Sequence, residues 1–522
     1  MSSHLGNDME ALFYPVLLVA AFTLPPYSSG FLPPLFNPAS SFLQSTPPIE
    51  EPIIQDPTLL TQPSNDVIIT LHDPLRQILN SHLNHGYPSR DSHINSLVSD
   101  LQGFSLMSQS PILDLIKNAT GAHAIPFWIS NQLAVKNATP SLLTTLVNSR
   151  LVKNITRDLF FPVMPILNMA IGKEPNGPEW GIMKINAHKL WNITQGEGII
   201  VATIDTGARL SHTSLKNNYV GAENYGWFDP LLNADEPYDP NGHGTHTTAT
   251  IAGDNGVGVA PKVKWMACKG CDAFNCFQSS LLACGQFILC PTDPQGNNPD
   301  CTKAPHIVSN SWGGGGEADF FNPTIASWQA AGIIPFFAIG NKGPGCNTTS
   351  HPGDQNNVIA VGATDVNDRL ARFSSRGQNP DSVLIKPEIL APGKDINSAF
   401  FLNDNAYRIM SGTSMACPLV AGAAALLLSI NPQLGYEDIR DLFYETSYRG
   451  ITHGDGPQCG NIIGTEYPNH MYGHGRLDVY EAYKKMMEGA TYKRDENLQN
   501  ITTAPSKPPG GITITLTLPK LF

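Results

Sequence analysis

The sequence predicts an α/β protein in which helices cover a mostly parallel central sheet, preceded by a smaller α+β module. Apolar residues in the second half of the chain form short unbroken runs between helical segments, as expected for strands buried on both faces. These runs are residues 198–204, 262–267, 307–310, 333–339 and 358–361. Residues 66–158 instead combine alternating and helically spaced apolar positions, which indicates a separate compact module.

Length and composition set limits on function. The chain has 522 residues, 41% of them apolar, which is enough for a sizeable core and about three domains. Lys and Arg number 32 against 44 Asp and Glu, so the net charge of −12 disfavours nucleic acid as a partner. The longest apolar stretch, 11–24, falls short of the roughly 18 residues that a membrane-spanning helix needs, so we predict no integral membrane span.

The N-terminal region favours secretion. The stretch 11–24 has the length of a signal-peptide core, and small residues follow it, so residues 1–30 are predicted to be a signal segment. Asp8 and Glu10 lie where basic residues are usual, which leaves a buried hydrophobic segment as the alternative. Glycosylation triplets of the form Asn-x-Thr point to a secreted or vacuolar/lysosomal glycoprotein. They begin at Asn118, Asn137, Asn154, Asn192, Asn347 and Asn500.

Composition shifts suggest the domain boundaries. Residues 31–65 are rich in Pro and Ser and are predicted to be a linker that precedes the module 66–158. Residues 159–179 include a Gly- and Pro-containing stretch of the kind that proteases nick. The α/β domain is predicted over 180–490, and a polar tail, 491–522, contains one possible edge strand at 512–518.

Nine cysteines, six of them within 268–301, indicate disulfides formed in an oxidising compartment. Cys268 and Cys271 have the spacing of zinc ligands, but no second pair completes a tetrahedral set, so zinc is the weaker alternative. The odd count leaves one free thiol, for which Cys417 is our candidate. The pairing of the other eight stays open, since 105 connectivities are possible.

Three polar clusters carry the candidate chemistry, at the strand ends and helix starts where α/β sheets bind ligands. They are Asp205-Thr-Gly207, Asn241-Gly-His-Gly-Thr-His246 and Ser411-Gly-Thr-Ser-Met-Ala416. Each has a plainer interpretation when taken alone: a turn-forming Asp, a metal pair of His243 and His246, and a helix-capping Ser. Their joint occurrence in this order is not expected by chance.

Together these clusters resemble the three signatures of the subtilase family of serine proteases, in the family order Asp, His, Ser. Within the family the chain most resembles bacillopeptidase F-like members. The resemblance rests on Tyr238-Asp-Pro-Asn-Gly-His-Gly-Thr-His246, on Ser309-Asn-Ser-Trp-Gly-Gly-Gly-Gly316 and on the long segment between them. The resemblance implies a subtilisin-like three-layer domain with a mostly parallel central sheet. It also implies that residues 66–158 are an inhibitory and chaperoning pro-domain, removed by cleavage between about Asp158 and Trp180.

The same resemblance implies roles for individual residues. Asp205, His243 and Ser414 would form the catalytic triad of a secreted serine endopeptidase, and the amide of Asn341 would contribute to the oxyanion hole. The substrate backbone would bind along one segment of the chain. That segment consists of Ser309, Asn310, Ser311, Trp312 and Gly313.

Partners and cofactors follow from the family. We expect protein or peptide substrates, the chain's own pro-domain as an intramolecular inhibitor, and a monomer. No cofactor is expected to be required; structural calcium is common in the family, but no ligand loop matches here.

Two departures from the family pattern motivate a rival hypothesis. They are Thr247-Thr-Ala249 after the histidines and Cys417-Pro-Leu419 after the serine motif. The rival is a catalytically silent subtilase fold that binds other proteins. An α/β-hydrolase esterase is a weaker alternative, because no Gly-x-Ser-x-Gly elbow precedes a helix.

Overall fold

The computed structural model describes residues 53–489, apart from 55, 73–74, 84–85, 166, 315–319, 378–383, 453–455 and 461–464. All of these belong to one compact unit, Glu51–Phe522. The predicted signal segment, most of the predicted linker 31–65, and the tail 491–522 with its possible strand lie outside the described residues.

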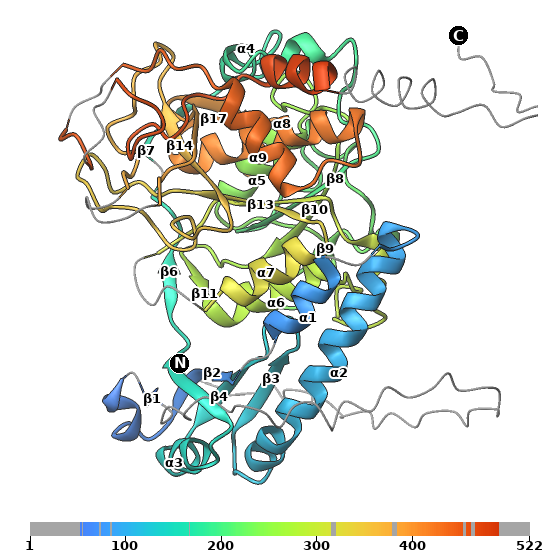
Figure 1. Ribbon diagram of the computed structural model, residues 1–522, viewed down its shortest axis with the longest axis vertical. Coiled ribbons are helices and arrows are strands. Elements are labelled where there is room, and N and C mark those ends of the chain that lie inside the picture. Colours follow the sequence, from blue (N-terminus) through green and yellow to red (C-terminus); the bar gives the residue numbers. More distant parts are fainter. Residues whose placement is uncertain are drawn as a thin grey trace, which may run out of the picture. The chain divides into compact units, whose positions relative to one another are not determined.

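A seven-stranded sheet forms the centre of the larger part of the fold, in the order β15-β14-β13-β12-β8-β10-β9 (Figure 1). Every neighbouring pair in it is parallel, which confirms the predicted α/β class. The strands are β8 (Ile200–Asp205), β9 (Trp227–Phe228), β10 (Lys264–Lys269), β12 (Ile307–Asn310), β13 (Ile334–Ala338), β14 (Ile359–Thr364) and β15 (Ile389–Pro392). The outer strands β9 and β15 were not predicted; β9 has only two residues, too few to define a period.

Helices cover both faces of this sheet. On one side α5 (His243–Ala252), α8 (Thr413–Ile430) and α9 (Tyr436–Thr446) share an apolar cluster with the strands. On the other side α6 (Gln278–Leu289) and α7 (Asn322–Ala330) share a second cluster. The three-layer arrangement therefore follows from apolar residues on both faces of the strands.

Helix α8 is the most apolar of the described α-helices. It is long and apolar enough to cross a membrane, but 89% of it is buried inside the protein. Its contacts with β12, β13, β14 and β15 show that its composition suits a core helix. No other helix among the described residues meets the length and hydropathy criteria for a membrane span.

The N-terminal residues form a second sheet, in the order β1-β5-β2-β4-β3. Its strands are β1 (Ile53–Ile54), β2 (Asn65–Leu71), β3 (His123–Phe127), β4 (Gln132–Ala138) and β5 (Val152–Arg157), and its helices are α1 (Leu75–Leu83), α2 (Arg90–Lys117) and α3 (Pro140–Asn148). Order begins earlier than residue 66, because β1 and a short 3-10 helix, η2 (Pro57–Leu60), join the module and bury Leu59. Elements this short carry no periodicity, so they could not be predicted from the sequence.

The N-terminal module contacts the α/β part through polar groups as well as apolar ones. The Trp128 N–H donates to Gln286 Oε1 at 2.8 Å, and Ser327 Oγ donates to the Ile129 carbonyl at 2.8 Å. Arg90 donates to the carbonyls of Ala304 and Pro305. The module therefore docks on α6, α7 and the segment that precedes β12.

The segment after the module lies across the α/β part as two short strands. Strand β6 (Phe160–Pro162) pairs antiparallel with β11 (Asn275–Phe277). Strand β7 (Leu167–Ile171) pairs antiparallel with β17 (Tyr407–Ser411), which also pairs with β16 (Ile396–Ala399). The first half of the predicted activation linker is thus bound, whereas most residues of 173–178 are exposed.

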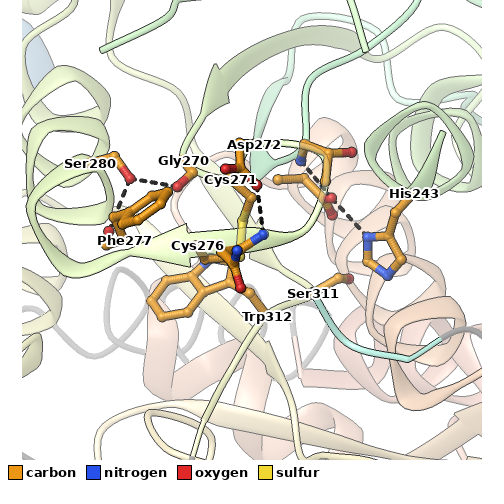
Figure 2. The surroundings of a disulfide bond; sticks show 12 residues. His243, Gly270, Cys271, Asp272, Cys276, Phe277, Ser280, Ser311 and Trp312 are labelled. Atoms are coloured by element: carbon orange, nitrogen blue, oxygen red, sulfur yellow. Dashed lines mark hydrogen bonds and ion pairs between the residues drawn. A yellow bond between two sulfur atoms is a disulfide. The ribbon is translucent and has the colours of Figure 1, made fainter. Parts of the chain in front are cut away.

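Eight of the nine cysteines form four disulfides, as predicted. The ninth, Cys417, is the free thiol that we expected, and it is buried. The pairs are Cys268–Cys284, Cys271–Cys276, Cys290–Cys301 and Cys346–Cys459. Figure 2 shows Cys271–Cys276 and the residues around it. Because Cys268 and Cys271 both lie in disulfides, they are not the thiolate ligands that the zinc alternative required.

Candidate active site

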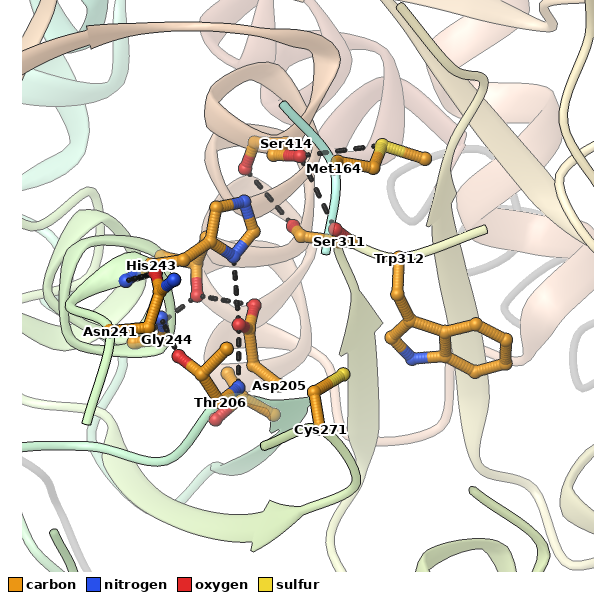
Figure 3. Close-up of polar contacts among 12 residues, drawn as sticks. Met164, Asp205, Thr206, Asn241, His243, Gly244, Cys271, Ser311, Trp312 and Ser414 are labelled. Atoms are coloured by element: carbon orange, nitrogen blue, oxygen red, sulfur yellow. Dashed lines mark hydrogen bonds and ion pairs between the residues drawn. The ribbon is translucent and has the colours of Figure 1, made fainter. Parts of the chain in front are cut away.

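Asp205 is the last residue of β8, and its buried carboxylate accepts hydrogen bonds on both oxygens (Figure 3). Oδ1 accepts the Thr206 N–H at 2.7 Å and a 2.7 Å bond from His243 Nδ1. Oδ2 accepts the Thr247 hydroxyl at 3.1 Å. Three donors thus hold one carboxylate at the tip of a central strand.

His243 is the first residue of α5, and a network centred on Asp239 fixes the turn that presents it. Asp239 Oδ1 accepts the N–H groups of Asn241 and Gly242, and Oδ2 accepts the N–H and hydroxyl of Thr245. The role of Asp239 was not predicted. The sequence Asp-Pro-Asn-Gly, typical of a side-chain-stabilised turn, was the available signal.

The close approach of α5 to β8 depends on glycine. A Cβ on Gly244 would overlap the carbonyl oxygen of Gly207, and a Cβ on Gly207 would overlap that of Tyr238. Gly207 also has a φ of +116°, which disfavours other residues. The glycines in two of the three motifs therefore allow the Asp205 and His243 side chains to meet.

The two histidines of α5 differ in charge behaviour although both are buried. Burial alone would lower the pKa of His243, but the charge and hydrogen bond of Asp205 outweigh it and raise that pKa above its ordinary value. Burial lowers the pKa of His246 to about 3, so His246 is neutral. Its Nε2 donates to the carbonyls of Ile396 and Arg408, which gives it a structural role instead of the metal-pair alternative.

Ser414 is the second residue of α8, where free N–H groups and the helix dipole favour negative charge. Pro418 is the sixth residue of α8 and so lies beyond its first turn. It cannot donate to the carbonyl of Ser414, and Ser311 Oγ donates to that oxygen instead, at 3.0 Å. This bond ties the start of α8 to the end of β12.

The hydroxyl of Ser414 is not bonded to His243. Ser414 Oγ donates to the Ser311 carbonyl at 3.2 Å and approaches Met164 Sδ at 3.5 Å. His243 Nε2 is buried and has no hydrogen-bond partner among the described residues. Figure 3 shows the thioether of Met164, from the segment between β6 and β7, beside Ser414.

Asn341 follows β13 with its side chain oriented by the neighbouring motif. Asn341 Oδ1 accepts the N–H and hydroxyl of Thr413, at 2.8 and 3.0 Å. The amide Nδ2 is 4.0 Å from Met164 Sδ. The Met164 thioether therefore contacts both the Ser414 hydroxyl and the Asn341 amide.

The five residues predicted to bind the substrate backbone divide into two groups. Ser309 and Asn310 lie within β12, and their main chains pair with β8 and β13. Ser311, Trp312 and Gly313 follow the strand; the Ser311 carbonyl faces Ser414, and a Cβ on Gly313 would contact the end of the Met164 side chain. Of the five residues, only Ser311–Gly313 lie outside the pairing of the sheet, and their binding of substrate stays a prediction.

The structure adds residues near the site that sequence reasoning missed. These residues are Met164 and Asp239. Strand β11, which pairs with the linker, was also not predicted. The Thr247 hydroxyl, which we noted only as a departure from the family pattern, reaches Asp205. Burial raises the pKa of Cys417 to about 12, so its thiol stays protonated and packs as a small apolar side chain. Within the described ranges no group of three or more His, Cys, Asp or Glu is placed to hold a metal ion.

Comparison with known proteins identifies the family. Residues 196–475, more than half of the chain, match the Subtilase family. The chain belongs to the subtilase family. The match includes Asp205, His243 and Ser414 within its span.

Individual subtilases are similar over different extents. Bacillopeptidase F of Bacillus subtilis (strain 168) is 33% identical over 432 residues, which cover 76% of this chain and 29% of that protein. Subtilisin DY of Bacillus licheniformis is 35% identical over 279 residues, 51% of this chain and 90% of its own. Subtilisin Savinase of Lederbergia lenta is 33% identical over 273 residues, again 51% and 90%. The chain spans less than a third of bacillopeptidase F, and that similarity extends beyond the residues that match the family.

Proposed function

We infer that the protein is a secreted serine endopeptidase that hydrolyses peptide bonds through Asp205, His243 and Ser414 and is made as a zymogen. The observation that carries this inference is the 2.7 Å bond between Asp205 and His243, close to a serine at the N-terminus of a buried helix. Membership of the subtilase family supports the reaction class. Carboxylate, imidazole and hydroxyl are the three groups that acyl transfer by a serine requires.

Each residue has a chemical task in this mechanism. His243 takes the proton of Ser414 as the hydroxyl oxygen attacks the substrate carbonyl, and it returns that proton to the leaving amine. Asp205 holds the imidazole and stabilises its protonated form. The Asn341 amide and the Ser414 N–H stabilise the oxyanion, for which one donor contributes about 10²- to 10³-fold in rate. Water then hydrolyses the acyl-enzyme by the reverse sequence of proton transfers.

The position of the linker supports the zymogen part of the proposal. Met164 Sδ lies against Ser414 Oγ and near Asn341 Nδ2, in the space that a substrate carbonyl needs. The Ser414 hydroxyl, bonded to Ser311, must turn toward His243 before reaction. Release of the linker would free both donors and let that turn occur. The exposed stretch 173–178 is accessible for the activating cleavage.

Secretion rests on the disulfides. Four bridges in one chain require an oxidising compartment. The relatives by themselves do not assign a location, because one of them is named as an intracellular serine protease. The vacuolar or lysosomal lumen, which we considered from the sequence, gains no support.

Labelling with a fluorophosphonate tests the proposal. We expect the activated wild-type protein to label and to hydrolyse peptides, and Ser414→Ala to do neither and to stay full length. Ser429→Ala, at the other end of α8, is the matched control and should behave as wild type. If neither wild type nor Ser414→Ala labels although the fold is intact, the silent binding protein becomes the better reading.

A further inference from the structure

The hairpin 270–277, which Figure 2 shows around its disulfide, contacts both the candidate catalytic Asp205 and the linker strand β6. At one end the Cys271 N–H donates to the main-chain oxygen of Asp205 at 3.1 Å. At the other end Cys276, in β11, is the register partner of Phe161 in β6. The disulfide Cys271–Cys276 joins the two ends, and both cysteines are buried.

Strand β11 has little support from any sheet. It is three residues long, and its only sheet partner among the described strands is β6. Once the linker is released, as the proposed function requires, β11 loses that partner. A strand edge without a partner stays extended only if other bonds hold it, because ordering each residue costs about 1–2 kcal/mol of conformational entropy.

The hairpin supplies such bonds itself. The Asp272 carboxylate accepts the N–H groups of Phe274 and Asn275 at 2.6 and 2.7 Å. The Asp272 N–H donates to the Asn275 carbonyl at 2.8 Å. Cys271 and Cys276 also form an isolated antiparallel bridge at the base of the hairpin. The disulfide closes this base covalently.

The hairpin is also tied to the histidine loop. Asn241 Nδ2 donates to the Ala273 carbonyl at 2.8 Å, and Asn241 Oδ1 accepts the N–H of His243 at 3.0 Å. At its base, Ser280 Oγ donates to the Gly270 carbonyl at 2.6 Å. A peptide paired with β11 is therefore held at a fixed place relative to Asp205 and His243.

We propose that the Cys271–Cys276 disulfide is a positioning element for peptide substrates. It keeps β11 extended, so that a substrate pairs with it as Phe160–Pro162 does, and it sets that strand in place beside Asp205. This inference rests on the proposed function. A pre-ordered strand binds with a smaller entropic cost, so the disulfide acts on KM for substrates long enough to reach β11.

The chain offers a matched control in Cys290–Cys301. That disulfide also closes a short loop, with a sequence separation of 11 against 5, and it lies between the end of α6 and a 3-10 helix. Among the described residues, no hydrogen bond or strand pairing joins it to Asp205, His243 or β11. Its removal therefore reports the general cost of losing a disulfide.

The test compares two substrates on activated protein prepared from the full chain. The long one, acetyl-Phe-Pro-Val-Met-p-nitroanilide, copies residues 161–164, and the short one is acetyl-Met-p-nitroanilide. For C271A/C276A we expect kcat/KM on the long substrate to fall about tenfold, mainly through KM, since pre-ordering sets binding. The short substrate and the fluorophosphonate labelling rate should be unchanged, and C290A/C301A should match wild type in all three measurements.

An equal loss on both substrates, or no loss on the long one, would overturn the proposal. An equal fall in kcat/KM on the long substrate in C290A/C301A would overturn the proposal as well. Absence of labelling in the wild type would instead contradict the proposed function.

If C271A/C276A does not fold, C271S/C276S takes its place, because serine fills more of the space of each buried thiol and still removes the disulfide. A selective loss on the long substrate then supports the proposal. An unchanged ratio between the two substrates rejects it.

Discussion

The two halves of the candidate active site differ in how far they are assembled. On one side Asp205 accepts three donors and is joined to His243 at 2.7 Å. On the other side the Ser414 hydroxyl faces away from His243, and the Met164 thioether lies against it and near the Asn341 amide. The first half depends only on residues of the α/β part, whereas the state of the second depends on the linker. In the proposed zymogen, latency is thus confined to one side of the site.

The largest expected effect comes from the assembled half. Asp205→Asn removes the charge that orients and stabilises the His243 imidazole, so kcat should fall about 10⁴-fold. The measurement is kcat on a peptide anilide after activation, with near-ultraviolet circular dichroism as the check on folding. If kcat fell by less than about tenfold, the hydrogen bond between Asp205 and His243 would have a structural role only.

The linker half is tested by Met164→Ala. Truncating a buried Met costs about 2–5 kcal/mol, so the linker should bind more weakly and the uncleaved chain should label with fluorophosphonate at least about tenfold faster. Met169→Ala is the matched control, since that side chain of the same linker is 56% exposed. Equal labelling rates for Met164→Ala and wild type would show that the thioether does not restrict access to Ser414.

The pH dependence of kcat/KM tests the half of the site that contains Asp205 and His243. His243 acts as a base only when neutral, and its raised pKa places the acid limb of kcat/KM above the ordinary histidine value of 6.5. Activity should therefore fall tenfold per pH unit below that midpoint. In Asp205→Asn the burial of His243 is no longer opposed by the Asp205 charge. The pKa of His243, and with it the midpoint of the acid limb, should therefore move to lower pH. A midpoint that the variant leaves in place would assign the limb to another group.

The smallest expected effect concerns Thr247. Replacing it with Val keeps the shape but removes one donor to Asp205, which retains two others. A hydrogen bond contributes about 0.5–1.5 kcal/mol, so kcat should fall about threefold. Thr250→Val on the same helix, whose hydroxyl donates to the His246 carbonyl, is the control. Equal changes in both variants would indicate a loss of helix packing.

Sequence reasoning was most successful where the signal is local and periodic. Buried strands such as β8 and β12 were expected because unbroken apolar runs suit a parallel sheet with helices on both faces. Cys417 was expected to be the free thiol and is. The short elements β1, β9 and β11 were not foreseen, since two or three residues define no period.

By itself the sequence determined the fold class, because apolar runs and strand ends are local properties of the chain. It also determined the candidate triad, because three local motifs resemble the signatures of one family. Only the tertiary structure decided how those groups are used. The disulfide partners, the hydroxyl of Thr247 on Asp205, and the place of Met164 all depend on which distant segments pack together. Met164 and Ser414 are 250 residues apart in the chain, and no pattern along it encodes their contact. That contact arises because β6 and β7 find partners on either side of the site, and tertiary packing alone selects such pairs.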